Sequence, residues 1–461
     1  MSSEHDMEAS MYLTHFISLR SFAIAEPHQS YNRRLMRVFL SNLGCKLNQA
    51  ELEQLARQFR VAGYRLVGSL QEADLHILNS CTVTHAAARD SRKLARRGQR
   101  LNPGLRTVLT GCYVESDPEE AARLAGVDLV ISNRDKDRLL ELVLERFPTE
   151  SPTPDASGSI PIPYVPLEFG NSRALVKIED GCNMRCSFCI IPYTRGPQRS
   201  RPVSEVLQEV RGLAASGYRE VVITGVQISS YRWQDQQLFE LTQTLLQRTE
   251  IPRLRLTSIA PWQFDPRLLD LFSSPRLCRH VHLSLQSGCT DTLRRMRRPY
   301  TADEFADLVD RLRQEIPAVA ITTDIIVGFP GETDTEFAES LKFASRMDFA
   351  RLHAFPYSVR LGTDAAELPR QIPHGVKRQR MQEMLGVAQD SQKRFEQSHV
   401  HTTAEVLWEY QRNGAWHGMT DNYLRVVVES DEDLAHQITP VHLAEPNGYG
   451  LTCELPSPRP L

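Results

Sequence analysis

Three cysteine thiols lie close together in the segment GCNMRCSFCIIPYTRG, residues 181–196. Cys182, Cys186 and Cys189 follow the spacing C-x3-C-x2-C directly after a predicted strand, and no fourth cysteine lies near them. Cysteine thiolates hold iron–sulfur clusters, and a four-iron cubane ordinarily takes four of them. Three thiolates leave one iron open to another ligand. A zinc site completed by a distant residue is the alternative, but such sites more often use C-x2-C pairs.

A second set of cysteines, Cys45, Cys81 and Cys112, is spread along the first part of the chain. Each follows a predicted strand directly, in SNLGC, ILNSC and LTGC. In an open parallel sheet the loops at the carboxyl ends of the strands converge on one crevice. The three thiols can therefore meet at one point as ligands. The alternative is three independent cysteines in the core, which are common.

Strands and helices alternate between residues 36 and 147, which we predict to be an open, mostly parallel α/β sheet domain. The predicted strands are 37–43, 73–80, 106–111 and 127–132, and predicted helices cover 48–59, 84–101 and a stretch from Asp117. Residues 1–35 show no periodicity and are predicted to be an N-terminal extension, with Met36 as an alternative start. Six prolines between residues 148 and 171 predict an extended linker.

The alternation resumes over residues 172–398, where six predicted strands indicate a partial (β/α)6 barrel, short of the familiar eight units. These strands are 174–178, 220–225, 253–258, 280–286, 320–328 and 351–357, and a long polar helix is predicted over 375–398. Short strands over residues 399–461 predict a small β-barrel. The predicted fold class is therefore a multidomain α/β protein with a C-terminal β-barrel.

Polar residues and glycines stand at the carboxyl ends of the barrel strands, where chemistry is expected in such folds. Glycine permits a close approach of the backbone to a ligand. We interpret these residues as a cofactor cradle: Thr224, Gly225, Gln286, Ser287 and Gly328. Each turn alone is a weak signal, and their common position carries the argument.

Composition restricts the partners of the chain. Its 461 residues carry a formal net charge of -3, so any nucleic-acid surface must be local. Nine cysteines are too few for a disulfide scaffold, no apolar run is long enough to span a membrane, and no secretory signal is evident. We expect a cytoplasmic protein without a membrane partner.

Basic residues gather on one face of the helix predicted over 84–101. They are Arg89, Arg92, Lys93, Arg96 and Arg100. Such a stripe can hold phosphates, although a solvated helix face is the alternative. Arg195 and Arg199 form a second basic stretch just beyond the crowded cysteines, and we predict that both groups bind RNA.

The C-x3-C-x2-C loop after the first strand of a β/α barrel resembles the radical S-adenosylmethionine superfamily. That resemblance implies that the open iron chelates the methionine portion of S-adenosylmethionine and that electron transfer releases a deoxyadenosyl radical. Together with the second cysteine set, residues 37–461 resemble the methylthiotransferases. This implies two 4Fe-4S clusters, one held by Cys45, Cys81 and Cys112 and one by the catalytic Cys182, Cys186 and Cys189. Cys278, Cys289 and Cys453 match no ligand of the family and are interpreted as packing residues.

The motifs LGCKLNQAE, NSCTVTHAAARDSRK and EDGCNMRCSFCIIPYTRGPQRSRP are most similar to the branch that modifies threonylcarbamoyladenosine next to the tRNA anticodon. The resemblance implies the anticodon loop of tRNA and an electron donor such as flavodoxin or ferredoxin as partners. Modification of isopentenyladenosine in tRNA or of a ribosomal-protein aspartate is the catalytic alternative. An iron–sulfur electron carrier with an RNA-binding tail is the non-enzymatic one.

The C-terminal β-barrel resembles a TRAM domain, which usually binds RNA. Residues 399–461 nevertheless hold three Arg or Lys and nine Asp or Glu, which departs from the basic surface expected of such a module. We therefore expect any RNA contact of this barrel to come from aromatic side chains, for which Trp408, Trp416 and Tyr423 are the candidates.

Overall fold

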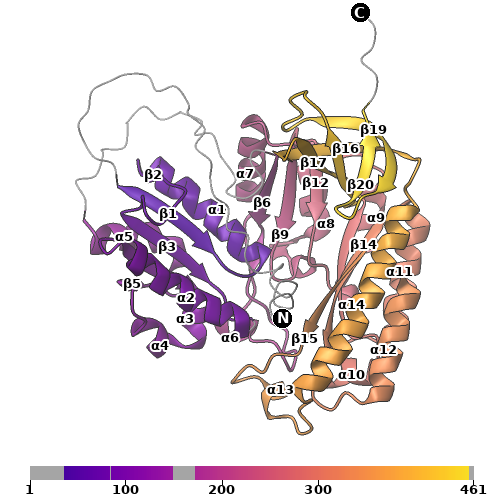
Figure 1. Ribbon diagram of the computed structural model, residues 1–461, viewed down its shortest axis with the longest axis horizontal. Helices are drawn as coiled ribbons and strands as arrows, with labels where there is room; N and C mark the ends of the chain where they lie inside the picture. The colour runs from indigo at the N-terminus through magenta and orange to yellow at the C-terminus, as the bar shows by residue number, and fades with distance from the viewer. Residues whose placement is uncertain (1–35, 84, 149–171, 456–461) are drawn as a thin grey trace, which may run out of the picture. The chain divides into compact units, whose positions relative to one another are not determined.

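The computed structural model describes residues 36–83, 85–148 and 172–455 (Figure 1). These residues form two compact units. The first contains residues up to 148 together with Ile191–Gly196, and the second contains residues 172–190 and 197–455. The predicted N-terminal extension and almost all of the Pro-rich stretch lie outside the described residues. Within the described ranges, no helix combines the length and the apolar character that crossing a membrane would require.

The first unit is built on a parallel sheet of five strands in the order β2-β1-β3-β4-β5. The strands are β1 (Arg37–Asn42), β2 (Arg65–Leu66), β3 (Leu75–Ser80), β4 (Arg106–Gly111) and β5 (Leu129–Val130). The helices are α1 (Lys46–Val61), α2 (His85–Leu101), α3 (Cys112–Ser116), α4 (Pro118–Ala122), the short 3-10 helix η1 (Lys136–Arg138), α5 (Leu139–Arg146) and α6 (Ile191–Thr194). The predicted α/β sheet is confirmed, and β2 is an additional edge strand.

Helix α1 buries polar as well as apolar side chains. Leu52, Leu55 and Phe59 are buried on the face that the sequence pattern predicts. Asn48 and Glu51 in its first turns are buried too, with 0% and 3% of their surface exposed. Buried polar groups of this kind require hydrogen-bonding partners, and these partners lie beside the first set of cysteines.

The second unit contains all six predicted barrel strands, which run parallel in two three-stranded sheets, β12-β9-β6 and β13-β14-β15. The strands are β6 (Arg173–Lys177), β9 (Glu220–Thr224), β12 (Arg253–Leu256), β13 (His280–Gln286), β14 (Ala320–Val327) and β15 (Arg351–Pro356). Isolated parallel bridges, Leu254 to Leu277 and Ile259 to Leu283, connect the segments of β12 and β13. The predicted six-unit partial barrel is confirmed.

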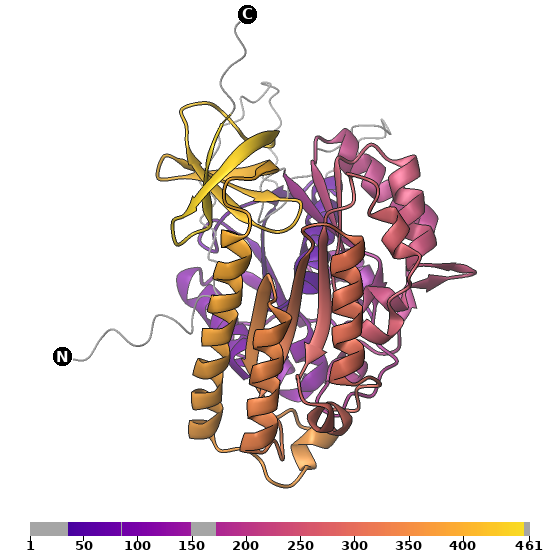
Figure 2. The ribbon, with the colours of Figure 1, turned by 90° about the vertical axis from the view of Figure 1, so that its right-hand side faces the viewer.

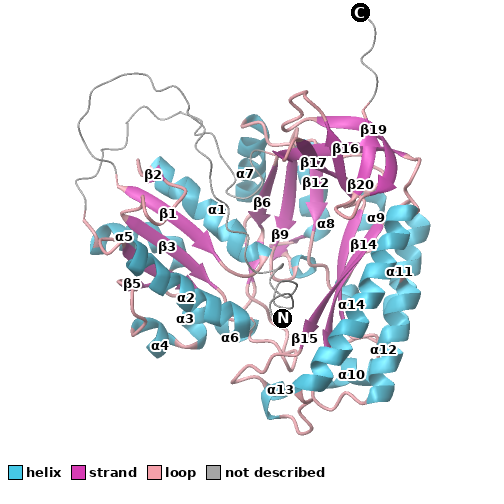
Figure 3. Cartoon of the chain, in the orientation of Figure 1, coloured by secondary structure: helices cyan, strands magenta, loops and turns pink. Residues whose placement is uncertain are grey.

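Amphipathic helices cover the outer face of these strands (Figures 2 and 3). The longer ones are α7 (Val203–Ala215), α8 (Leu238–Arg248), α11 (Ala302–Glu315), α12 (Asp334–Met347) and α14 (His374–Gln397). The short elements are β7 (Glu179–Asp180), β8 (Arg199–Ser200), η2 (Ile228–Ser230), β10 (Arg232–Trp233), β11 (Gln236–Gln237), η3 (Pro261–Gln263), α9 (Leu268–Leu271), α10 (Thr290–Arg295) and α13 (Asp364–Glu367). A continuous apolar core lies between strands and helices.

Five strands close into a small barrel at the C-terminal end of the second unit, as predicted. They are β16 (Thr403–Arg412), β17 (Ala415–Thr420), β18 (Arg425–Glu429), β19 (Ile438–Pro446) and β20 (Leu451–Glu454). Trp408 and Trp416 fill the core of this barrel, and Tyr423 stacks on His280 with 4.3 Å between ring centroids. The prediction that Trp408 and Trp416 contact RNA is therefore wrong, because both are buried in this core, whereas Tyr423 is partly exposed and its RNA contact stays a prediction.

Buried arginines at the amino ends of the partial-barrel strands hold the C-terminal barrel in place. The Arg255 guanidinium forms a bidentate ion pair with Glu220, at 2.7 and 3.0 Å, and also donates to the backbone of the C-terminal barrel. Arg253 donates to the carbonyls of Met419 and Glu405. Burial alone would raise the pKa of Glu220, but Arg255 outweighs it and the pKa is lowered. These contacts explain why both barrels belong to one compact unit.

Candidate metal centres

The first set of cysteines lies at the carboxyl ends of three neighbouring strands of the first unit. Cys45 follows β1, Cys81 follows β3 and Cys112 follows β4. The strand register places Asn42 beside Asn79 and Ser80 beside Gly111, so the residues just before the three cysteine loops are adjacent in the sheet. All three cysteines are free thiols. The structure therefore brings them to one edge of the sheet, as the sequence predicts.

Glycines directly before two of these cysteines let the neighbouring cysteine loops approach closely. Gly44 has a φ of +107°, and a β-carbon at this position would lie 2.5 Å from Cys81 Sγ. Gly111 has a φ of +101°, and a β-carbon there would meet the backbone of Ser80. Only glycine combines this backbone conformation with so close an approach. Two of the three cysteine loops therefore depend on a glycine directly before the cysteine.

The thiols of the first set act on one another electrostatically. Burial raises the pKa of the Cys81 thiol to about 12, and the nearby thiols of Cys45 and Cys112 raise it as well. Iron binding requires the thiolate form, so loading the site must release protons. Among the described residues, no group of three His, Cys, Asp or Glu side chains converges on a point where one metal ion would sit. A cubane needs no such point, because each iron takes its own thiolate, and the three thiols fit that ligand pattern.

The second set of cysteines lies in the loop that leaves the carboxyl end of β6. Cys182, Cys186 and Cys189 are partly exposed, and none of the three forms a disulfide. The loop is held by its own hydrogen bonds: the Cys189 amide donates to the Cys186 carbonyl at 3.1 Å, and the Met184 amide donates to Cys182 Sγ at 3.4 Å. Donors aimed at cluster sulfurs help to set a cluster's reduction potential. Three accessible thiols in one short loop fit a cubane with one open iron.

Arg298 is a residue of this centre that the sequence analysis missed. Its Nη1 donates to Cys186 Sγ at 3.5 Å and its Nη2 donates to the Ser284 carbonyl at 2.8 Å. The guanidinium lies over the Trp262 ring, 4.4 Å from its centroid, and Trp262 stacks on Tyr300. The run of basic residues RMRRPY contains this arginine, but nothing in the sequence distinguishes it from its neighbours.

The other predicted cofactor residues lie at the carboxyl ends of parallel strands, the same edge from which the second cysteine loop leaves. Gln286 ends β13 with a φ of +74°, next to a break in the strand register, and Gly328 follows β14 with a φ of +70°. Strained backbone of this kind in non-glycine residues occurs preferentially at functional sites. Gly225 packs against the Glu179 side chain, because a β-carbon on Gly225 would lie only 2.9 Å from Glu179 Cγ. Thr224 and Ser287 are each only 1% exposed, and Ser287 Oγ accepts from the Cys289 amide at 3.2 Å. The cofactor roles stay predictions.

Most members of the predicted basic stripe are exposed on α2. Arg89, Lys93, Arg96 and Arg100 point to solvent, whereas Arg92 is half-buried and pairs with Glu120 at 3.5 Å. Arg199 is half-exposed and lies 3.8 Å from Asp180. These residues remain candidates for phosphate contacts.

Arg195 does not belong to an RNA-binding surface. Its side chain is 1% exposed and is paired with Glu51 of α1. The segment Ile191–Gly196 was expected within the partial barrel, but it belongs to the first unit. The physical reason is this ion pair, because a charged side chain enters a protein interior only where a partner neutralises it. The RNA-binding prediction for Arg195 is corrected accordingly.

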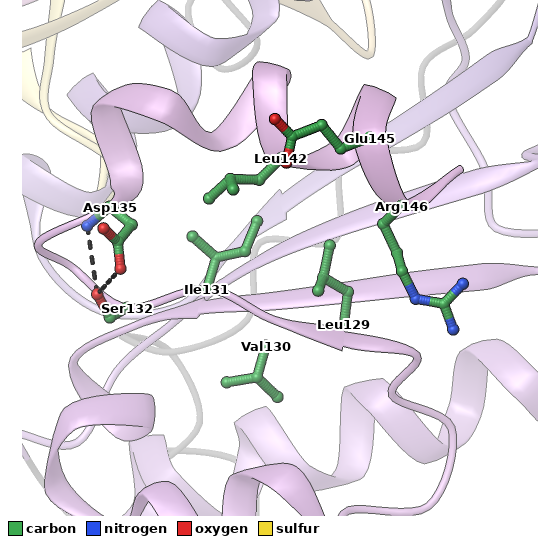
Figure 4. A pocket seen from close by; sticks show the side chains of 8 residues that line it. All are labelled: Leu129, Val130, Ile131, Ser132, Asp135, Leu142, Glu145 and Arg146. Carbon is green, nitrogen blue, oxygen red and sulfur yellow. Dashed lines mark hydrogen bonds between the residues drawn. The ribbon is translucent and has the colours of Figure 1, made fainter. Parts of the chain in front are cut away.

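A pocket of about 360 Å³ lies in the first unit between β5 and α5 (Figure 4). Leu129, Ile131 and Leu142 line it, and at one end Ser132 donates to Asp135 at 2.8 Å. None of its lining residues is a cysteine or a predicted site residue. We assign no chemistry to this pocket.

Comparison with known proteins decides the family. Residues 176–344 match the model of the Radical SAM superfamily, and residues 37–132 match a model described as "Uncharacterized protein family UPF0004". A threonylcarbamoyladenosine tRNA methylthiotransferase MtaB of Bacillus subtilis is 34% identical over 420 residues, which cover 88% of this chain and 93% of the relative. The chain belongs to the radical SAM methylthiotransferase family. This methylthiotransferase therefore uses iron–sulfur clusters of the 4Fe-4S type and S-adenosylmethionine.

Two further relatives show both branches of the family. The MtaB of Chlamydia pneumoniae is 37% identical, and the aligned residues cover 80% of this methylthiotransferase and 85% of the relative. A tRNA-2-methylthio-N(6)-dimethylallyladenosine synthase of Akkermansia muciniphila is 33% identical, and the aligned residues cover 90% of this methylthiotransferase and 99% of the synthase. Among solved structures, the radical S-adenosylmethionine methyltransferase TsrM of Kitasatospora setae superposes with a TM-score of 0.52 at 18% identity, covering 69% of this chain and 72% of TsrM. That likeness supports the fold.

Proposed function

We propose that this methylthiotransferase modifies tRNA, converting N6-threonylcarbamoyladenosine next to the anticodon into its 2-methylthio derivative. The observation that carries the proposal is the presence of two separate sets of three cysteines, one at the carboxyl ends of β1, β3 and β4 and one in the loop that follows β6, in a chain that matches tRNA methylthiotransferases over most of its length. The cysteine motifs quoted above and the names of these two relatives favour the threonylcarbamoyl branch.

The isopentenyl branch is the second candidate. A relative named for dimethylallyladenosine is 33% identical, close to the 34% and 37% of the MtaB relatives. Identity alone therefore separates the two substrates weakly. Threonylcarbamoyladenosine carries a carboxylate that isopentenyladenosine lacks, so a cation beside the second centre favours the first substrate. Arg298, which donates to Cys186 Sγ, is one cation in that position.

The reaction needs both centres because carbon 2 of adenine carries an unactivated C–H bond. There is no acidic proton for a general base and no leaving group for a nucleophile. When bound, the clusters and S-adenosylmethionine supply the radical that removes the hydrogen, the sulfur that replaces it and, from a second molecule of S-adenosylmethionine, the methyl group on that sulfur. The protein's own part is to orient the groups and to exclude water. Cys182, Cys186 and Cys189 would hold the centre that binds S-adenosylmethionine, and Cys45, Cys81 and Cys112 would hold the one that carries sulfur.

RNA contacts would come from exposed cations and exposed aromatic rings. The anticodon loop is single-stranded, so its bases can be splayed and stacked on aromatic side chains. On the C-terminal barrel, Tyr410 is 49% exposed and stacks on His417 with a centroid distance of 4.9 Å. On α2, Arg96 and Arg100 offer positive charge to the backbone phosphates. These are the residues we propose for tRNA binding.

The test uses purified, anaerobically reconstituted protein with S-adenosylmethionine, dithionite and two tRNAs, one carrying threonylcarbamoyladenosine and one carrying isopentenyladenosine. We expect the 2-methylthio product only from the first. Product only from the second would overturn the branch. Cleavage of S-adenosylmethionine without product from either tRNA would overturn tRNA as the substrate, and a ribosomal protein would then be the next substrate to assay.

A further inference from the structure

A network of buried, charged side chains lies in the first unit beside the first set of cysteines. Its centre is Glu51 of α1. Arg195 Nη1 donates to Glu51 Oε1 at 2.8 Å, and Lys136 Nζ donates to Glu51 Oε2 at 2.8 Å. The three side chains are between 1% and 7% exposed. Such a network is costly to bury, so it requires a reason beyond stability.

Hydrogen bonds extend this network into the cysteine loops. Asn48 Nδ2 donates to the carbonyl of Leu43, two residues before Cys45, and to the carbonyl of Ser80, directly before Cys81. Asn48 Oδ1 accepts from Arg195 Nη2 at 2.5 Å and lies 3.9 Å from Cys45 Sγ. Through Asn48, the Arg195 guanidinium therefore fixes the loops that carry two of the three thiols.

Two further contacts complete the network. Asn79 at the end of β3 donates to the Asn48 carbonyl at 2.9 Å, and its Oδ1 accepts from Lys136 at 3.2 Å. The two asparagines that link the network to the cysteine loops, Asn48 and Asn79, are thus each held at both the oxygen and the nitrogen of the side-chain amide. An arginine suits the place between Glu51 and Asn48 because its planar fork presents several N–H groups in a fixed geometry, whereas the donors of a lysine rotate on a flexible stem.

The network brings positive charge close to the first set of cysteines. Arg195 and Lys136 are both cations, and both donate to the single carboxylate of Glu51. A cubane core with three thiolates is anionic, and net charge and hydrogen bonds around a cluster set its potential. The positive charge of Arg195 would therefore stabilise an anionic cluster bound at these thiols.

We propose that Arg195 is a positioning residue for the cluster held by Cys45, Cys81 and Cys112: its buried guanidinium orients two of the ligand loops and supplies the positive charge that stabilises the reduced cluster. The inference rests on the ligand role given to these cysteines under the proposed function. Arg195 follows Cys189 by six residues in the chain. One short segment therefore carries the last ligand of one centre and the charge that tunes the other.

The experiment isolates the first cluster. In the full-length chain, Cys182, Cys186 and Cys189 are replaced by alanine, the protein is reconstituted anaerobically, and the reduction of the remaining cluster is followed by electron paramagnetic resonance during a potentiometric titration. Arg195→Gln, Arg195→Lys and Glu51→Gln are compared in this background. The matched control is Arg134→Gln, an exposed arginine of the same unit.

We expect Arg195→Gln to shift the reduction equilibrium towards the oxidised cluster by about tenfold or more, which is about 59 mV for a one-electron couple. Glu51→Gln should shift it in the opposite direction, because it removes a negative charge. Arg195→Lys keeps the charge and should shift it less than Arg195→Gln, and Arg134→Gln should leave it unchanged.

If Arg195 and Glu51 acted only by holding the fold, their variants would not shift the reduction potential in opposite directions. The proposal would be overturned if Arg195→Gln changed the reduction equilibrium constant by less than twofold, or if Arg195→Gln and Glu51→Gln shifted the reduction potential in the same direction. Absence of iron from the parent background would instead overturn the ligand role of Cys45, Cys81 and Cys112, on which the proposed function also depends. Iron content measured before the titration separates these two failures.

Discussion

The Gly44→Ala variant tests the geometry of the first centre most sharply. The added β-carbon would lie 2.5 Å from Cys81 Sγ, whereas heavy atoms in contact normally stay about 3.5 Å or more apart. The thiol must therefore move by about 1 Å, or the Gly44 loop must. Metal–ligand distances tolerate only about 0.2 Å. We expect the variant to lose the first cluster and to keep the second.

A matched control separates this contact from backbone strain. Gly44 has a φ of +107°, so an alanine there is also strained, by about 1–2 kcal/mol. Gly217, at the end of α7, has a φ of +89°, and no atom lies within 4 Å of its missing β-carbon. Gly217→Ala therefore introduces similar strain without the contact.

The assay is iron content with product analysis. The parent protein should bind about eight irons, from two cubanes. Gly44→Ala should bind about half as many, still cleave S-adenosylmethionine and form no thiomethylated nucleoside, whereas Gly217→Ala should match the parent in all three readouts. Full iron loading and normal product formation in Gly44→Ala would refute the placement of Cys81 in the cluster.

Three further predictions follow from other buried and exposed groups. His76 is buried and its pKa is lowered to about 3. The neutral imidazole of the folded state therefore contributes its full stability above the ordinary histidine pKa near 6.5, and this contribution is lost as the pH falls below it. The free energy of unfolding should fall by about 1.4 kcal/mol between about pH 7.5 and pH 5.5, and His76→Gln should remove this pH dependence. Glu220→Gln leaves the Arg255 charge buried without its anion and should cost about 3–5 kcal/mol in denaturant unfolding. Reversing Arg96 and Arg100 to glutamate should weaken tRNA binding, and the slope of log affinity against log salt should flatten by about 0.9 for each phosphate that the variant no longer neutralises.

The fold was predictable where periodicity is strong. The six strands of the partial barrel and the closed C-terminal barrel are confirmed. The partial barrel could be predicted because apolar strands that alternate with amphipathic helices can pack into only a few fold classes. The assignment of Ile191–Gly196 to the first unit was not predictable. It depends on an ion pair between Arg195 and Glu51, which are 144 residues apart in the chain, and no local pattern carries that information.

The candidate site was predictable at the cysteines and less so around them. The position of each cysteine directly after a strand is enough to place Cys45, Cys81 and Cys112 at one sheet edge. The prediction of an RNA contact for Trp408 on the C-terminal barrel failed for a local reason. Trp408 and Tyr410 are two residues apart and would share a face in a regular strand, but a break in register between them turns Trp408 inward and leaves Tyr410 exposed.

The most direct test of the central claim is mass spectrometry of tRNA nucleosides from cells with and without the gene for this chain. We predict that 2-methylthio-threonylcarbamoyladenosine disappears when the gene is deleted, that unmodified threonylcarbamoyladenosine accumulates, and that a plasmid copy restores the product. A copy lacking Cys45, Cys81 and Cys112 should not restore it. Persistence of the 2-methylthio derivative in the deletion strain, with loss of a different modified nucleoside or of none, would contradict the account.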